Sequence, residues 1–473
     1  MRLVPLSSKA LWGILLLATI PLAYKEYWPH HTFPTSVAKL LRKGLWAESN
    51  KGEYDYQLAL KYYIEALDEA KNLKLDPISD EYTGIQLKIA EMLERLSMYE
   101  EAFLIYSEIL TLYLTVLTAQ PDNPNFKPLT MDQRDHLIMK DLRLAVKIGR
   151  ELENPNLMKP FMMTHLLIAT DQICRKLGHG ANLASAVEYV QRNAVVNGTS
   201  TKVSSQPLLM KPSKRGSVQV VKKTEDSLIV SCGDGTTLEI VQNPDAWEPF
   251  IDEYFQASDI YILSLILLED ITGAFESSIN LWEQMILADY RVPHRFLQHT
   301  CNIGSLCFNR AEQYEYGEIK LRREIAKTLG IEDHLSLTAE QIEASDKVSR
   351  VDKDAFRELV KQKDFSIGEA KSTYEMVLNA IKENHQADID KHADVINSDT
   401  SKEIQNTRYV AESSALASYG LGVINLHLGK FDDAERYLRE ARIKAKKIEY
   451  GMLIDNIEDE LGKVFRERSQ QSQ

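Results

Sequence analysis

One spacing of small and bulky residues recurs in three stretches of the sequence, and it limits the possible fold more than any other feature. In the first stretch Ala47 is followed twelve positions later by Ala59, and the bulky Tyr63 comes four positions after that. The residues that keep this register are Ala47, Ala59, Tyr63 and Ala66, then Ala90, Ala102 and Tyr106, and finally Gly422, Ala434 and Ala441. Two antiparallel helices joined by a short turn can cross closely only where both carry small side chains. The spacing therefore predicts stacked helical hairpins whose crossings are filled by these residues.

This register resembles the tetratricopeptide repeat, in which small and bulky positions recur in the same way and a turn like the Gly-Lys-Phe of residues 429–431 joins the two helices. Weaker copies lie at residues 273–282 and, in a split form, at Gly304 with Ala370 and Tyr374. The copies are not separated by a uniform repeat of about 34 residues, so inserts must interrupt them. We therefore predict an all-α fold, a tetratricopeptide-like helical-hairpin solenoid.

Three segments interrupt the helical pattern. Residues 197–223 lose it and gain Ser, Pro and Lys, which is typical of a linker. Directly after them, residues 227–241 alternate in hydropathy around Gly233-Asp234-Gly235, a pattern that predicts a small β-hairpin insert. Residues 382–407 are mostly polar and are expected to be exposed.

An uncharged apolar run occupies residues 10–24, at the start of an otherwise water-soluble sequence. Its fifteen residues rise about 22 Å as a helix, less than the roughly 30 Å of a bilayer core. The run can extend in the N-terminal direction because the stem of Lys9 can lie along the helix. We predict one N-terminal transmembrane helix over residues 10–28. The alternative is a cleavable secretory signal, which Pro21 disfavours because small residues normally precede the cleavage site.

These patterns divide the chain into six segments. They are a short N-terminal tail (1–9), the transmembrane anchor (10–28), an N-terminal repeat region (36–195), the linker with the hairpin (196–243), a C-terminal repeat region (244–465) and a disordered tail (466–473). At 473 residues the chain is long enough to bury one extended core or about two or three compact ones.

The charge and cysteine content exclude several classes of function. A net charge of −13 argues against a nucleic-acid surface, because phosphate binding needs a concentrated basic face. Basic residues within residues 2–43 are the exception, and they can either contact anionic headgroups or simply be solvated. The four cysteines show no paired spacing, so neither a disulfide framework nor a zinc site is expected.

No catalytic motif is expected to operate in this chain. The one cluster of candidate metal ligands, within residues 385–394, lies in the polar insert, where nothing would hold His and Asp side chains in a fixed geometry. Gly422 and Lys430 do not form a phosphate loop, because Phe431 stands where Ser or Thr is required. Signatures of hydrolases, metalloproteases and dinucleotide-binding enzymes are not found. We predict a binding protein that is not an enzyme and needs no cofactor or metal.

Four segments resemble, in the same order, the fungal inner-membrane adaptor of the mitochondrial i-AAA protease or its close paralogue. They are LRKGLWAESNKGEYDYQLALKYYIEALDE, DEYTGIQLKIAEMLERLSMYEEA, NPDAWEPFIDEYFQASDIY and SSALASYGLGVINLHLGKFDDAE. The resemblance implies a single-pass protein of the mitochondrial inner membrane whose soluble domain lies in the intermembrane space. It also implies that the protein binds unfolded or misfolded membrane proteins and delivers them to the i-AAA protease, together with a second adaptor subunit.

An adaptor of this kind must bind many unfolded chains weakly, so aromatic side chains are candidates for client contact. The candidates are Trp46, Tyr56, Tyr62 and Trp247. For Trp247, packing at a helix start is the alternative. A second class of function is a chaperone or import co-receptor, but its clamp for acidic C-termini needs asparagines where this register holds Glu48 and Lys88. A third is a passive scaffold of a membrane complex.

Overall fold

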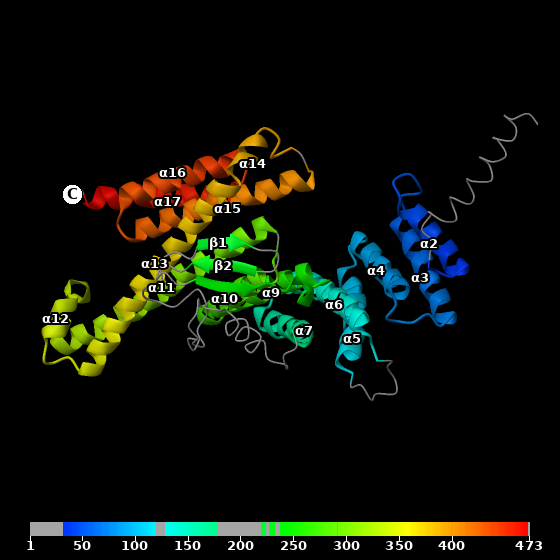
Figure 1. The fold of residues 1–473 in the computed structure, drawn as a ribbon, viewed down its shortest axis with the longest axis horizontal. Coiled ribbons are helices and arrows are strands. Elements are labelled where there is room, and N and C mark those ends of the chain that lie inside the picture. Colours follow the sequence, from blue (N-terminus) through cyan, green and yellow to red (C-terminus); the bar gives the residue numbers. More distant parts are fainter. Residues whose placement is uncertain are drawn as a thin grey trace, which may run out of the picture. The chain divides into compact units, whose positions relative to one another are not determined.

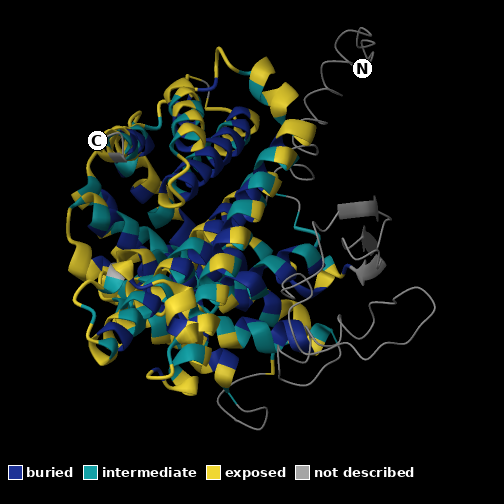
Figure 2. Cartoon of the chain, turned by 90° about the vertical axis from the view of Figure 1, so that its left-hand side faces the viewer, coloured by how far each residue is buried: buried dark blue, intermediate teal, exposed yellow. Residues whose placement is uncertain are grey.

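The computed structural model of the chain describes residues 32–119, 128–177, 219–223, 227–231, 237–290, 292–398 and 400–471. The chain divides into two compact units, residues 1–127 and residues 128–473 (Figure 1). The predicted tail at 1–9 and anchor at 10–28 lie outside the described residues. In both units buried residues gather between neighbouring helices and exposed residues cover their outer sides (Figure 2).

The first unit forms two helical hairpins over the residues that the structure describes. Its helices are α2 (Thr35–Glu48), α3 (Tyr56–Asn72), α4 (Asp80–Arg95) and α5 (Tyr99–Thr118). Asp55 and Ser79 determine where α3 and α4 begin, since their side-chain oxygens accept hydrogen bonds from first-turn amides at 3.0 and 3.2 Å. Each helix packs against the next one along the chain.

The first hairpin closes at the crossing where the repeat register places its small residues. Ala47 on α2 is 1% exposed, and Ala59 on α3 is fully buried. Tyr63 fills the adjacent space so closely that a Cβ atom on Gly44 would lie 2.6 Å from its ring. A side chain at residue 44 would therefore push the two helices apart.

Among the described helices, α5 has the length and apolar composition of a membrane span. Its buried face, which includes Ala102, Tyr106 and Tyr113, packs within the first unit, where α5 contacts α4. A core helix of a soluble protein passes the same test of length and composition. We therefore assign α5 to the second repeat.

The second unit is also built from helices. They are α6 (Met131–Glu151), α7 (Pro155–Lys176), α9 (Ile251–Leu267), α10 (Ile271–Leu287), α11 (Pro293–Leu329), α12 (Ala339–Ala344), α13 (Arg350–Asn384), α14 (Gln386–Lys391), α15 (Lys402–His427), α16 (Phe431–Lys447) and α17 (Gly451–Gln471), with the short 3-10 helices η1 (Pro244–Ala246) and η2 (His334–Ser336). Because α17 continues to Gln471, residues 466–471 are helical where the sequence predicts a disordered tail.

Three short strands lie between α7 and α9 in chain order. They are β1 (Gln219–Lys223), β2 (Ser227–Ser231) and β3 (Thr237–Val241). They form one antiparallel sheet in the order β1-β2-β3, with Leu228 opposite Ile240, while the predicted turn at 233–235 lies outside the described residues. The helices on both sides of the strands pack together, since α9 contacts both α6 and α7. The compact units therefore divide at residues 127 and 128, not at the insert of residues 196–243.

The middle of the second unit is organised around Tyr374 on α13. Its ring lies between Gly304 of α11 and Gly420 of α15, because Cβ atoms added at these positions would come within 2.9 Å and 2.4 Å of it. The Tyr374 and Ser305 hydroxyls are 2.8 Å apart. Burial raises the pKa of Tyr374, so the phenol stays neutral inside the unit. One side chain thus joins three helices where they approach most closely.

Helices α11 and α13 are longer than the other repeat helices, with 37 and 35 residues. Where η2 and α12 connect them, at the far end of the pair in Figure 1, a small separate core forms. Its buried members are Ile325, Ala326, Leu337, Ile342, Val348 and Phe356. Nearby, the buried carboxylate of Glu318 accepts hydrogen bonds from Arg322 and Lys363, each at 2.5 Å. This pairing satisfies a charge that would otherwise destabilise the helix pair.

The polar insert predicted at residues 382–407 is partly helical and partly buried, which corrects the expectation that it is exposed. Helix α13 continues into it, α14 follows directly, and α15 begins before it ends. Ile396 is 4% exposed and packs with Ile404, Ala411 and Ile448. Ile396 and Ile404, with the partly buried Ile389, hold this otherwise polar segment against the core.

We expect Gly420→Ala to destabilise the second unit, because the added methyl group would overlap the Tyr374 ring, which Gly304 confines on another side. Overpacking of this kind costs about 1 to 3 kcal/mol. Urea denaturation followed by circular dichroism measures the free energy of unfolding, with Gly462→Ala as the matched control. Gly462 lies in α17 with open space around it, so alanine there should be neutral or stabilise by at most about 1 kcal/mol. Equal unfolding curves for the two variants would contradict this packing.

Candidate binding surface

A groove of about 610 Å³ lies between α4 and α5 in the first unit. Tyr82 and Gln86, one turn apart on α4, form one wall. The α5 wall is a stripe of residues spaced three or four positions apart, which places them on one side of the helix. The residues from α5 are Leu104, Ser107, Glu108, Ile109, Thr111, Leu112 and Thr115, and Pro77 joins them from the loop before α4.

The polar groups of the groove differ in what they can still bind. The hydroxyls of Thr111 and Thr115 donate to backbone carbonyls one turn earlier on α5, each at 2.7 Å. The Gln86 side chain is 8% exposed, yet its Oε1 accepts no hydrogen bond from any residue that the structure describes. A buried amide oxygen without a donor costs about 1 to 3 kcal/mol. The Oε1 atom itself is buried, so a rotation of the Gln86 side chain toward the groove would let a ligand N–H recover that energy.

Apolar side chains continue from the groove onto the surface of α5. Leu104 is 68% exposed, and Tyr99 and Phe103, close before it on the helix, are 66% and 40% exposed. Exposed apolar side chains that lie together, instead of singly, mark surfaces that bind other chains. The groove and its surroundings therefore offer apolar contacts and one buried amide acceptor.

A charged network joins the two hairpins of the first unit. Lys88 on α4 lies 3.2 Å from the Glu48 carboxylate on α2 and 2.8 Å from Glu91 on its own helix. Arg95 continues the network, 3.0 Å from Glu91 and 3.2 Å from the Tyr56 hydroxyl. Burial alone would lower the pKa of Lys88, but its hydrogen bonds to Glu91 and Glu48 raise it. Burial would raise the pKa of Glu91, but the hydrogen bonds from Lys88 and Arg95 lower it.

This network occupies the positions that a clamp for acidic C-termini would use. Lys88 is already paired with two carboxylates, and Glu48 would repel an incoming carboxylate. These two positions therefore pair with each other through Oε1 of Glu48, and they present no convergent donors to a ligand.

The aromatic residues predicted to contact clients lie outside the groove. Trp46 is 57% exposed on α2. Tyr56 and Tyr62 are half-buried, and a cation approaches each ring: Arg95 is 5.2 Å from the Tyr56 ring and Lys43 is 5.5 Å from the Tyr62 ring. The described part of the chain therefore does not place these side chains in the groove. The sequence did not predict the groove residues. No local pattern shows that Gln86 is buried or that its Oε1 lacks a hydrogen-bond donor among the described residues.

The prediction that Trp247 contacts clients is wrong, because its ring is buried. It is 2% exposed in the second unit, and the neighbouring Phe250 is fully buried. Lys176 at the end of α7 holds this turn by donating to the carbonyls of Asp245, at 3.2 Å, and Glu248, at 2.6 Å. Trp247 thus has the packing role that was its alternative.

The ten residues assigned to repeat packing are all buried. The nine that carry side chains are between 0% and 6% exposed, namely Ala47, Ala59, Tyr63, Ala66, Ala90, Ala102, Tyr106, Ala434 and Ala441. Gly422 is buried as well, and a Cβ atom there would lie 2.7 Å from the Leu438 side chain. These positions build the frame that holds the surface residues in place.

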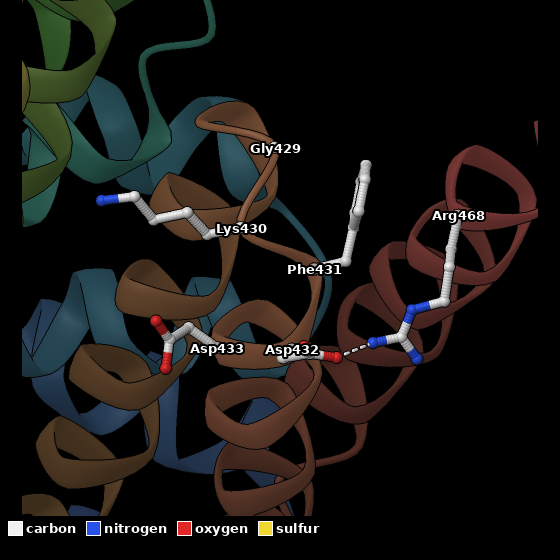
Figure 3. Close-up of a pocket in the computed structure, with 6 residues that line it drawn as sticks. All are labelled: Gly429, Lys430, Phe431, Asp432, Asp433 and Arg468. Atoms are coloured by element: carbon white, nitrogen blue, oxygen red, sulfur yellow. Dashed lines mark hydrogen bonds and ion pairs between the residues drawn. The ribbon is translucent and has the colours of Figure 1, made fainter. Parts of the chain in front are cut away.

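A smaller hollow of about 300 Å³ lies in the second unit, at the turn between α15 and α16 (Figure 3). Arg468 of α17 forms ion pairs there with Asp432 and, at 3.0 Å, with Glu435. Lys430 and Asp433 point away from Arg468 (Figure 3). Because two carboxylates already neutralise Arg468, we interpret the hollow as a junction that fastens α17 to α16.

No group of three or more His, Cys, Asp or Glu side chains within the described ranges is placed to hold a metal ion. The candidate ligands at residues 385–394 lie on α14 and its flanking turns, where His392 is 3.8 Å from Glu403. Burial raises the pKa of Cys301 and of Cys307 to about 12, so both remain protonated thiols and poor nucleophiles at neutral pH.

Comparison with known proteins relates this architecture to a family. Residues 120–290 match the family model described as the MGR3 middle domain. The mitochondrial inner membrane i-AAA protease supercomplex subunit MGR3 of Saccharomyces cerevisiae is 29% identical over 443 residues, which are 91% of this chain and 77% of that protein. The protein MRG3-like of the same yeast is 26% identical over 439 residues, 93% of this chain and 84% of that protein.

Two further matches add little to these. A TPR repeat-containing protein of Schizosaccharomyces pombe is 33% identical over 78 residues, 16% of this chain and 22% of that protein. The TPR domain of P58(IPK) aligns with 92% of this chain, and 99% of its own, at 12% identity and a TM-score of 0.17, too low to bear on the fold. The resemblance to the adaptor family or its paralogue is confirmed, and identities of 29% and 26% do not separate the two.

We expect Lys88→Met to destabilise the first unit at neutral pH by about 1 kcal/mol or less, because Lys88 and Glu91 are more than a third exposed and water screens the pair. The pKa of Glu91 is lowered in the folded protein, so Glu91 contributes stability at pH values above the ordinary carboxylate pKa. This contribution is lost as the pH falls. The raised pKa of Lys88 contributes stability that is lost only as the pH rises above it.

The melting temperatures of wild type and variant should therefore differ most between about pH 6 and pH 9, and should converge near about pH 3, where carboxylates are protonated. Lys71→Met is the control, because Lys71 is 55% exposed and lies 3.7 Å from Asp68, which is 65% exposed. If the difference in melting temperature between wild type and Lys88→Met is the same at acidic and neutral pH, the ion pairs of Lys88 do not stabilise the first unit.

Proposed function

We propose that this chain is a membrane-anchored, tetratricopeptide-like adaptor of the mitochondrial i-AAA protease supercomplex. It binds unfolded or misfolded inner-membrane proteins and delivers them for degradation, and it performs no catalysis itself. The observation that carries the proposal is similarity along 91% of the chain to MGR3, which its name makes a subunit of that supercomplex. The proposal places a single span in the inner membrane, the soluble domain in the intermembrane space and a second adaptor subunit beside it.

The groove between α4 and α5 supports the client-binding part of the proposal. An adaptor for many sequences needs apolar contacts without a deep pocket, and polar groups that read the backbone instead of particular side chains. Leu104 and Leu112 supply the first, and the Oε1 atom of Gln86 supplies the second, since every residue except proline carries a backbone N–H. An extended, partly apolar segment is the form of client that this groove accepts.

A membrane anchor would supply the delivery step without further contacts. When a groove is tethered beside a protease by a short linker, its effective local concentration reaches the mM range, about the level at which weak binding is sufficient. Weak binding also means a short residence time, so the client is released readily. The same property therefore explains both broad recognition and transfer.

The alternatives remain a chaperone or import co-receptor and a passive scaffold. The Glu48–Lys88 pair disfavours the co-receptor. These residues stand at the two clamp positions and form an ion pair with each other, so neither is available to bind an acidic C-terminus. An array of peptides probed with the full-length protein separates the three functions. Binding of apolar segments supports the adaptor, binding of acidic C-termini supports the co-receptor, and no binding supports the scaffold.

We expect Leu104→Glu to weaken the binding of apolar peptides by roughly tenfold, because it places a carboxylate beside Glu108 in the groove and removes about 1.5 kcal/mol or more of apolar contact. Fluorescence anisotropy with labelled unfolded segments measures the Kd. Leu157→Glu is the matched control, since Leu157 is 58% exposed on α7 and lies outside the groove. The groove is not the client site if both variants bind as tightly as wild type.

Localisation and partner can be tested together in mitochondria that carry a C-terminally tagged chain. We expect the tag to resist added protease in intact mitochondria and to be digested once the outer membrane is ruptured, because the proposal places the soluble domain in the intermembrane space. Purification through the tag in mild detergent should recover the i-AAA protease. A tag that stays protected after rupture, or that recovers no AAA+ protease, contradicts the proposal.

A further inference from the structure

The exposed side of α2 carries residues that the client groove does not use. Lys39, Arg42, Lys43 and Trp46 follow one another at helical spacing, which places them on one side of the helix. We call these four residues the basic face of α2. All four are exposed, and Trp46 is 57% exposed. The residues of α2 that are buried within the unit are Val37, Ala38, Gly44 and Ala47.

This face is positive in a protein that is negative overall. The chain has a net charge of −13, yet α2 contains one acidic residue, Glu48, whose carboxylate is engaged by Lys88 of α4. Lys39 and Arg42 form no ion pair with any residue in the described part of the chain. Lys43 lies over the Tyr62 ring instead of beside a carboxylate. No carboxylate among the described residues of the first unit therefore neutralises the charge of the basic face.

The basic face also lies close in sequence to the predicted anchor. The span predicted at residues 10–28 ends seven residues before α2 begins at Thr35, and seven residues reach at most about 25 Å. A helix held this near a bilayer meets the headgroup region. There, Lys and Arg are attracted to acidic lipids and a Trp ring is favoured because one end can stay wet.

We infer that the basic face of α2 is a docking surface for acidic phospholipid headgroups and holds the first unit against the membrane. The inference rests on the anchor in the proposed function and adds a second membrane contact to it. Lys39, Arg42 and Lys43 bind headgroup phosphates, while the Trp46 ring lies at headgroup depth. This assigns Trp46 to lipid instead of to clients. The client groove is formed by α4 and α5, so both surfaces can be occupied at once.

The test is lysine footprinting of the full-length protein in lipid nanodiscs, made either of phosphatidylcholine alone or with about a third phosphatidylglycerol. A short pulse of an acetylating ester modifies accessible lysines, and mass spectrometry gives the rate at each. We expect the rates at Lys39 and Lys43 to fall several-fold in the acidic nanodiscs. They should recover in about 1 M salt, where the Debye length shrinks to roughly 3 Å. Lys446, exposed on α16, is the internal control and should react equally in both lipids.

A charge-reversal variant, Lys39→Glu with Arg42→Glu, should lose the protection of Lys43 while the chain still enters the nanodiscs through its anchor. Both side chains are exposed, so circular dichroism should show unchanged helix content. Equal rates in the two lipids, for a chain that enters both, would overturn the lipid contact and leave the proposed function intact. A chain that does not enter the bilayer would overturn the anchor and both proposals. Protection that appears only when an unfolded polypeptide is added would assign the face to clients and overturn the inference.

Discussion

The structure depends on how closely helices can approach where small side chains meet. In the first unit the crossing of α2 and α3 is possible because Ala47 and Ala59 leave no bulk between the helices. In the second unit Tyr374 fits between α11 and α15 because Gly304 and Gly420 leave room for its ring. Interiors packed at this density resist deformation, so the surface residues are carried on a rigid frame. The basic face of α2 is positioned by the first of these crossings, and the groove by the packing of α4 against α5, where Ala90 and Ala102 are buried.

Polar side chains inside this frame show which groups are structural and which are available. Buried or half-buried charges are mostly paired: Glu318 has two basic partners, Lys88 has two acidic ones, and Asp141 lies 2.8 Å from His165, with burial raising the Asp141 pKa. These ion pairs hold the charged groups within the frame, although the Oδ1 atom of Asp141 accepts no hydrogen bond from the described residues. Gln86 differs because it lines an open groove while its buried Oε1 accepts no hydrogen bond from the described residues. That combination is what makes the groove the candidate client site.

The proposed function uses two kinds of weak interaction that become effective through tethering. The groove would contribute apolar contacts and one acceptor for a client's backbone N–H. Such contacts suit many client sequences and discriminate little among them. The anchor and the basic face of α2 would fix where that groove stands relative to the bilayer. Neither surface needs high affinity, because a protein confined beside its partner meets it at high local concentration. Similarity to MGR3 along most of the chain is consistent with this division of labour.

The sequence by itself determined the helical hairpins, since the pairing of Ala47 with Ala59, or of Gly422 with Ala434, is a local matter of two helices joined by a short turn. It also carried the resemblance to MGR3 and its paralogue. Only the tertiary structure decided that α9 packs against α6 and α7 across a long insert and that Trp247 is buried. It also decided that the buried Oε1 of Gln86 accepts no hydrogen bond from the described residues. Burial and hydrogen bonding depend on neighbours that are far apart in the chain. The local spacing of residue types does not show which distant residues become neighbours.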